Sequence, residues 1–81
     1  MKTYIVYCPD YREDINNCHE INAINHNQAA LAYAYRHGIS DLVKSALVFV
    51  VDISSRLEWK IRAERCGDLD YSTYIESEPQ S

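Results

Sequence analysis

Glycine, proline and paired cysteines are scarce in this chain, and each scarcity argues against a class of site. Its 81 residues include two glycines, two prolines and three cysteines. The glycines, Gly38 and Gly67, stand alone, so there is no glycine-rich loop of the kind that binds phosphate. The cysteines form no C-x-x-C pair, so the close ligand pairs typical of structural zinc are missing.

The chain also lacks a long apolar run and an excess of positive charge. No run approaches the roughly 18 apolar residues of a membrane-spanning helix, and a strand-like pattern stands where a signal peptide would have its apolar region. We therefore expect a cytoplasmic protein with reduced thiols and no membrane contact. The formal net charge is −4. Because nucleic-acid-binding surfaces are typically cationic, we expect no direct binding to nucleic acid.

The excess negative charge lies at the C-terminal end. Basic and acidic residues cancel over residues 1–67, whereas Asp68, Asp70, Glu76 and Glu78 follow without a basic residue. Such a segment suits a basic protein surface, because opposite charges steer association. The chain is long enough for one small core, which leaves little volume for a deep substrate cleft. These features favour a non-enzymatic binding protein.

A central apolar hairpin organises the predicted fold. Its first half, 46–51, is an unbroken apolar run typical of a strand covered on both sides. Its second half, 57–63, alternates apolar and charged residues, which is typical of a strand with one side exposed to solvent. Residues 3–8 are rich in β-branched and aromatic side chains, and 18–24 alternate, which predicts a second hairpin with a long connecting loop. The segment 70–76 is either a further strand or an extended arm.

One main helix is expected between the hairpins. Residues 28–37 are alanine-rich, and Asn25 or Asn27 can cap the first turn. The stripe expected to face the sheet is Ala30, Leu31, Ala34 and Tyr35. The segment 40–44 is either a short helical turn or an ordered loop.

The predicted order is therefore β-β-α-β-β-(β). It gives a two-layer α+β fold, with an antiparallel sheet of four to five strands and one main helix on one face. We expect a single domain over residues 1–76 and a frayed tail over 77–81.

Three cysteines and three histidines raise the question of a metal or thiol site. Cys8 ends one predicted strand, and Cys18 and His19 begin its neighbour, so a zinc site or a thiol nucleophile with a histidine base is conceivable. The more ordinary interpretation is that the thiols fill small apolar spaces and the histidines lie in polar loops. We therefore predict no cofactor, metal or catalytic residue, with a small thiol- or zinc-dependent enzyme as an alternative.

Tyrosine is unusually frequent, with seven copies, and three of them stand among acids. Large aromatic side chains beside carboxylates suit a contact with a basic partner. In the other interpretation, Tyr71 and Tyr74 cover the sheet edge and Tyr11 packs on its own loop. The predicted partner-binding residues are Asp10, Tyr11, Glu13, Asp14, Asp68, Asp70, Tyr71, Tyr74 and Glu76.

The passage EINAINHNQAALA over residues 20–32, together with the MKTYIV start, resembles small phage and mobile-element proteins, including some anti-CRISPR inhibitors. The resemblance covers about the first half of the chain and is one of general character. It implies a stoichiometric inhibitor that binds a basic surface of a nucleic-acid-handling complex, such as a CRISPR surveillance complex. The alternative is a structural or regulatory module that forms a homodimer through the sheet edge at 70–76.

Overall fold

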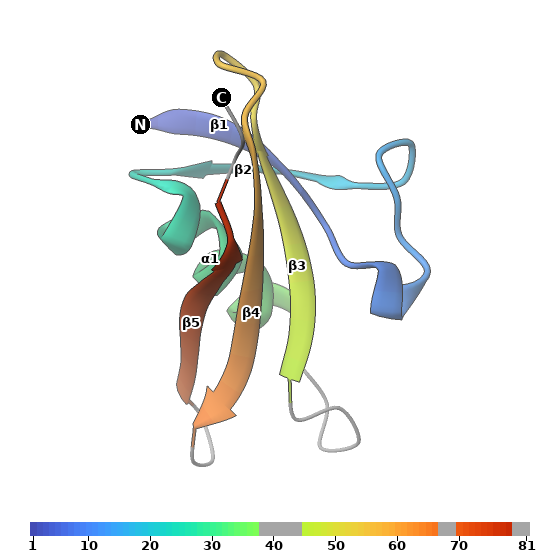
Figure 1. The fold of residues 1–81 in the computed structure, drawn as a ribbon, viewed down its shortest axis with the longest axis vertical. Helices are drawn as coiled ribbons and strands as arrows, with labels where there is room; N and C mark the ends of the chain where they lie inside the picture. Colours follow the sequence, from blue (N-terminus) through green and yellow to red (C-terminus); the bar gives the residue numbers. More distant parts are fainter. Residues whose placement is uncertain (38–44, 67–69, 79–81) are drawn as a thin grey trace.

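In the computed structural model, a helix packs on one face of a five-stranded antiparallel sheet (Figure 1). The structure describes residues 1–37, 45–66 and 70–78. The predicted α+β architecture is confirmed. The elements are β1 (Lys2–Tyr7), the 3₁₀ helix η1 (Pro9–Tyr11), β2 (His19–Ala23), α1 (His26–His37), β3 (Ser45–Asp52), β4 (Glu58–Cys66) and β5 (Asp70–Ser77).

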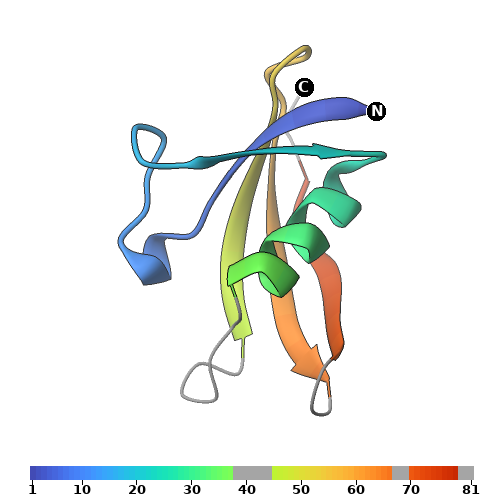
Figure 2. The same ribbon diagram turned by 180° about the vertical axis from the view of Figure 1, so that it is seen from behind.

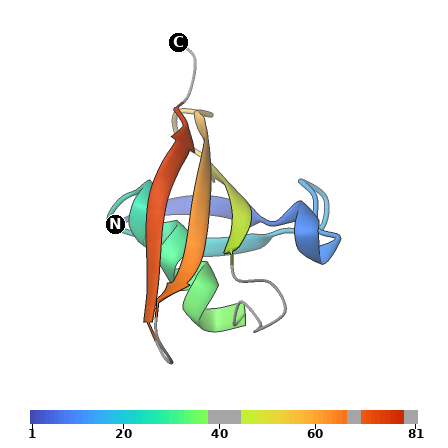
Figure 3. The same ribbon diagram turned by 60° about the horizontal axis from the view of Figure 1, so that its bottom comes forward.

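The strands follow the order β2-β1-β3-β4-β5, and every neighbouring pair is antiparallel. The apolar run of the predicted central hairpin therefore lies in the middle strand, β3. The sheet is strongly twisted: β1 and β2 run across the long axis along which β3, β4 and β5 lie (Figure 3). The segment predicted as either strand or arm is a strand, since β5 pairs with β4 from Asp70 to Ile75.

Helix α1 lies across one face of the sheet and contacts all five strands (Figure 2). Its cap is Asn25, whose Oδ1 accepts a hydrogen bond of 2.9 Å from the Gln28 N–H. No helix in the described part of the chain is long and apolar enough to cross a bilayer. Gly38, which follows the predicted helical segment, and the segment 40–44 lie outside the described residues.

The helix faces the sheet with a different stripe from the predicted one. The buried residues are Ala29, Ala30, Tyr33 and Ala34, whereas Tyr35 is 52% exposed. The predicted stripe of Ala30, Leu31, Ala34 and Tyr35 is therefore one residue too far along the helix. Tyr33 is fully buried because its hydroxyl has a hydrogen-bond acceptor, Glu13, inside the fold.

The core fills the space between α1 and the sheet. Alternation along each strand sends one set of side chains to this face, and the alternation predicted for 57–63 is confirmed by the burial of Ile61 and Ala63. Small alanines on the helix let it approach the sheet closely. The largest fully buried strand side chains are Tyr4, Val6, Ile21, Val48, Val50 and Ile61.

The opposite face of the sheet has no covering layer among residues 1–37, 45–66 and 70–78 (Figure 1). This corrects the expectation that 46–51 would be covered on both sides. Val48 and Val50 are buried beneath α1, but Leu47, Phe49 and Val51 on the other side of β3 are only partly buried. One helix covers only one face of a sheet, so the other face stays uncovered.

Candidate protein-binding surface

The uncovered face of the sheet, called the open face below, is the candidate site. Its centre is an apolar stripe on β1 and β3, every member of which is partly exposed. The apolar stripe consists of Ile5, Tyr7, Leu47, Phe49 and Val51. Among the described residues of β2, β4 and β5, five carboxylates and two cations lie around it. These charged residues are Glu20, Glu58, Lys60, Arg62, Glu64, Asp70 and Glu76.

Cross-strand register explains how carboxylates come to border the stripe. Ile5 of β1 pairs with Glu20 of β2 on one side and with Val51 of β3 on the other. Val51 in turn pairs with Glu58 of β4. Paired residues in an antiparallel sheet point to the same face, so an apolar pair lies between two acids.

The next row carries the aromatic side chains. Tyr7 pairs with Phe49, and their rings meet edge to face with centroids 5.1 Å apart. Lys60, the β4 partner of Phe49, places its Nζ 5.6 Å from the phenyl centroid. The Tyr7 hydroxyl donates a hydrogen bond of 3.4 Å to Glu58, and burial, followed by this carboxylate, raises the tyrosine pKa. The two rings thus form a fixed aromatic centre.

Polar contacts connect β5 to the other charged residues around the stripe, and this ring of charged residues is called the charged rim below. The Arg62 Nε donates a hydrogen bond of 2.6 Å to Glu76, and the Tyr74 hydroxyl donates one of 3.1 Å to Glu64. The bond to Glu76 raises the pKa of Arg62, and the charges of Glu76 and Asp10 add to this effect. Arg62 is therefore a cation surrounded by acids, and the face stays negative around it.

A second polar cluster lies away from the open face, beneath the β1–β2 connection. Glu13 Oε1 accepts hydrogen bonds from the Tyr33 hydroxyl (2.6 Å) and the Cys8 N–H (3.0 Å), and Oε2 lies 2.6 Å from His19 Nε2. Burial on its own raises the pKa of Glu13, but the hydrogen bonds from Tyr33, His19 and Cys8 outweigh it and hold the pKa below its ordinary value. The cluster fixes the long connection onto the helix.

The structure does not bring the predicted partner-binding residues together. The acidic segment 10–14 lies in the β1–β2 connection, while β5 forms the opposite edge of the sheet (Figure 1). Asp70, Tyr74 and Glu76 do lie on the open face, but Tyr71 points to the helix side, where it meets Tyr35. Asp68 lies outside the described residues.

Three of the four predicted residues in the connection have roles within the fold. Tyr11 packs against the core, and the Glu13 side chain is 13% exposed within its cluster. Asp14 accepts hydrogen bonds from the N–H groups of Asn16 and Asn17, which shapes the turn. Asp10 in η1 is exposed. Of the three acids in this segment, only Asp10 has no such side-chain bond among the described contacts.

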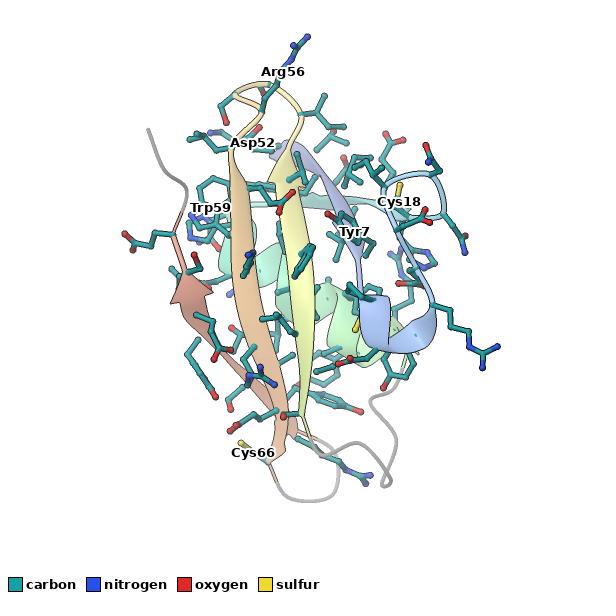
Figure 4. All side chains as sticks on the ribbon, turned by 45° about the vertical axis from the view of Figure 1, so that its right-hand side comes forward. Tyr7, Cys18, Asp52, Arg56, Trp59 and Cys66 are labelled. Atoms are coloured by element: carbon teal, nitrogen blue, oxygen red, sulfur yellow. The ribbon has the colours of Figure 1, made fainter. Side chains whose placement is uncertain are left out.

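The thiols do not converge. Cys8 is fully buried, and burial raises the pKa of its thiol, which favours the protonated form. Figure 4 shows Cys18 at the β1–β2 connection and Cys66 at the far end of β4. Within the described ranges, no group of three or more His, Cys, Asp or Glu side chains is arranged to hold a metal ion.

His26 and the single tryptophan, Trp59, form a stacked pair, with ring centroids 4.1 Å apart and an interplanar angle of 5°. Burial lowers the pKa of His26 from its ordinary value of 6.5. Because a protonated imidazole quenches a stacked indole, we expect Trp59 emission to fall on acidification with a midpoint below pH 6.5. His26→Gln should remove this step and His37→Gln should keep it. A step that survives in His26→Gln would contradict the assignment.

Sequence reasoning missed the apolar stripe, although a signal for it was present. The pattern predicts one main helix, and one helix covers one face of a sheet. An apolar run in the middle strand therefore had to leave part of its surface uncovered. Tyr7 and Phe49 became neighbours only through the pairing of β1 with β3, which are distant in sequence.

No protein-family model, curated protein or solved structure matches this chain.

Proposed function

We propose that this chain is a non-enzymatic protein-binding inhibitor whose open face covers a basic surface of a nucleic-acid-handling complex. The observation that supports the proposal is the combination of an apolar stripe with five carboxylates against two cations around it. Binding surfaces commonly have an apolar, aromatic centre that excludes water and a polar rim that selects the partner. An acidic rim selects a basic one.

A CRISPR surveillance complex is the partner class we propose, in the cytoplasm of a phage-infected host. Complexes of this kind hold their guide and target strands in positively charged channels. A small acidic domain seated in such a channel competes with nucleic acid for the same cations, and it needs no chemistry of its own. This proposal keeps the function implied by the resemblance but moves the contact from the predicted acidic segments to the open face.

The test measures binding of the purified chain to a panel of purified surveillance complexes, with labelled target DNA as competitor. We expect the chain to bind at least one complex and to displace its DNA. Phe49→Ala should weaken binding by about tenfold or more, because it removes the centre of the apolar stripe. Ile53→Ala removes an apolar side chain that is 47% exposed in the β3–β4 turn, and it should leave affinity unchanged.

Charge reversal tests the acidic rim separately. The double variant Glu20→Lys, Glu58→Lys should slow association and reduce its dependence on salt, because rim charges act mainly on the rate of encounter. Binding to no complex in the panel would contradict the proposed function. Binding of single-stranded oligonucleotides by the isolated chain would contradict it too, since aromatic rings beside a lysine on a sheet also suit base stacking.

A further inference from the structure

The outer edge of β5 is a second, different binding feature. β5 pairs with β4 on one side, and no strand of the described residues pairs with its other side. An edge strand presents a row of main-chain N–H and C=O groups with no partner strand. At eight residues, Asp70–Ser77 is longer than the usual strand of about five to six residues. The edge therefore offers a regular template for another strand from Asp70 to Ile75.

Proline and lysine, two residues that often protect such an edge, are missing from β5. Natural edge strands are blunted by proline, by lysine, by short length or by bulges. The sequence DYSTYIES contains neither proline nor lysine. The one irregularity in its pairing with β4 is a bulge near its C-terminal end: consecutive residues Lys60 and Ile61 of β4 pair with Ser77 and Ile75, so Glu76 is the extra residue on β5. From Asp70 to Ile75 the strand is regular.

The two sides of this edge differ in chemistry. On the open-face side stand Asp70, Tyr74 and Glu76, with Tyr74 46% exposed. On the helix side Tyr71 meets Tyr35 of α1 edge to face, with centroids 5.0 Å apart. Side chains of a strand docked here would alternate between a negative side and an aromatic side.

Pairing of β5 with a second copy of itself is disfavoured by charge. An antiparallel pair centred on Thr73 sets Asp70 of one copy opposite Glu76 of the other. Centred on Tyr74, it sets Asp70 opposite Glu78. Like charges directly opposite each other destabilise a sheet, and β5 has no cation to offset them. The edge is therefore better suited to a foreign strand than to a homodimer.

We propose that the edge of β5 binds an extended segment of a partner protein in which Lys or Arg alternates with apolar residues. The segment adds a sixth strand through main-chain hydrogen bonds, and its side chains select the register. Cations opposite Asp70 and Glu76 stand six residues apart, about 20 Å along the strand. Apolar side chains on the other side pack on Tyr71 and Tyr35. The inference rests on the proposed function in one respect, that the partner is basic.

The probe is the peptide acetyl-KVTVTVK-amide, which is palindromic and therefore matches the edge in either orientation. We expect it to shift and protect the backbone amides of residues 70–77 in NMR spectra of the isotope-labelled full chain. Acetyl-EVTVTVE-amide, which has the same strand propensity and opposite charge, should bind about tenfold more weakly or worse. Acetyl-KVTPTVK-amide should not bind, because proline interrupts the added strand.

A charge exchange gives the decisive comparison. Asp70→Lys should weaken binding of the lysine peptide and strengthen binding of the glutamate peptide, while Asn16→Lys, which adds a cation at an exposed position in the β1–β2 connection, should alter neither. Equal affinity for both peptides, or amide shifts confined to other strands, would overturn the proposal. A dimer with β5 amides protected in the absence of peptide would overturn it as well. Because no surveillance complex is used, these outcomes are independent of the test of the proposed function.

Discussion

Replacing Glu13 with alanine is expected to destabilise the fold by about 3 kcal/mol, because hydrogen bonds to a buried charged acceptor are among the stronger ones in proteins. The substitution removes the acceptor shared by Tyr33, His19 and the Cys8 N–H. For a domain of this size, such a loss lowers Tm by about 15 °C. Thermal and urea unfolding monitored by circular dichroism measures both quantities.

The matched control for Glu13→Ala is Glu20→Ala, which removes an equal charge from an exposed position one residue after His19. Its effect should stay within about 0.5 kcal/mol. Tyr33→Phe deletes one of the three donors and should fall between the two. If Glu13→Ala were no more destabilising than Glu20→Ala, the cluster would not anchor the β1–β2 connection.

The same cluster predicts how stability depends on pH. The pKa of Glu13 is lowered in the folded protein relative to its ordinary value of 4.5. Its contribution to stability is therefore complete above about pH 4.5 and is lost as the pH falls through the folded-state pKa. Asp52, whose pKa is also lowered, adds its own loss at acid pH. The difference in stability between wild type and Glu13→Gln isolates Glu13, and it should shrink below pH 4.5.

Enlarging a helix alanine should have the second-largest effect. Ala30→Leu is expected to cost about 2 kcal/mol, because overpacking forces neighbouring side chains and backbone to move. Ala30 is fully buried where α1 lies on the sheet, and α1 contacts every strand, so a shift of the helix affects the whole core.

Gln28→Leu is the control for this substitution. It introduces the same side chain on the exposed side of the same helix, and leucine is as good a helix former as glutamine. We expect stability within about 0.5 kcal/mol of wild type by chemical unfolding. Similar losses for both variants would mean that the close approach of α1 to the sheet does not limit the size of the side chain at position 30.

The two binding proposals concern neighbouring parts of one surface. Asp70 and Glu76 belong to the charged rim of the open face and to the edge of β5 at the same time. A partner that adds a strand at β5 would reach the apolar stripe with the residues next to that strand. A stable protein interface buries about 800 Å² per partner, more than a single added strand supplies. A partner that contacts both the apolar stripe and the edge of β5 can reach that buried area.

The candidate site was only partly predictable from the sequence. Tyr74 and Glu76 were named because aromatic and acidic residues gather near the C-terminal end, and both lie on the open face. Glu13 was named because it stands among the acids around Tyr11, but its carboxylate points inward, because the buried donors of Cys8 and Tyr33 are available to it. Composition shows that a charged side chain is present, but it does not show whether that side chain is exposed or hydrogen-bonded inside the fold.

Local pattern by itself determined the elements of this protein. Period-two alternation marked β2 and β4, an unbroken apolar run marked β3, and β-branched and aromatic residues marked β1. An alanine-rich segment after an asparagine cap marked the helix, and the count of one helix to one sheet followed from these elements. The physical reason is that backbone hydrogen bonding and the separation of apolar from polar side chains act over a few residues.

Tertiary structure alone decided which side chains meet. The pairing of β1 with β3 joined Tyr7 to Phe49, the rotation of α1 buried Tyr33 in place of Tyr35, and the sheet order separated the two acidic segments and left β5 at an edge. These outcomes depend on contacts between residues far apart in the chain. Which of these contacts form depends on free-energy differences between complete packed arrangements of the chain, so no local pattern of residues specifies them.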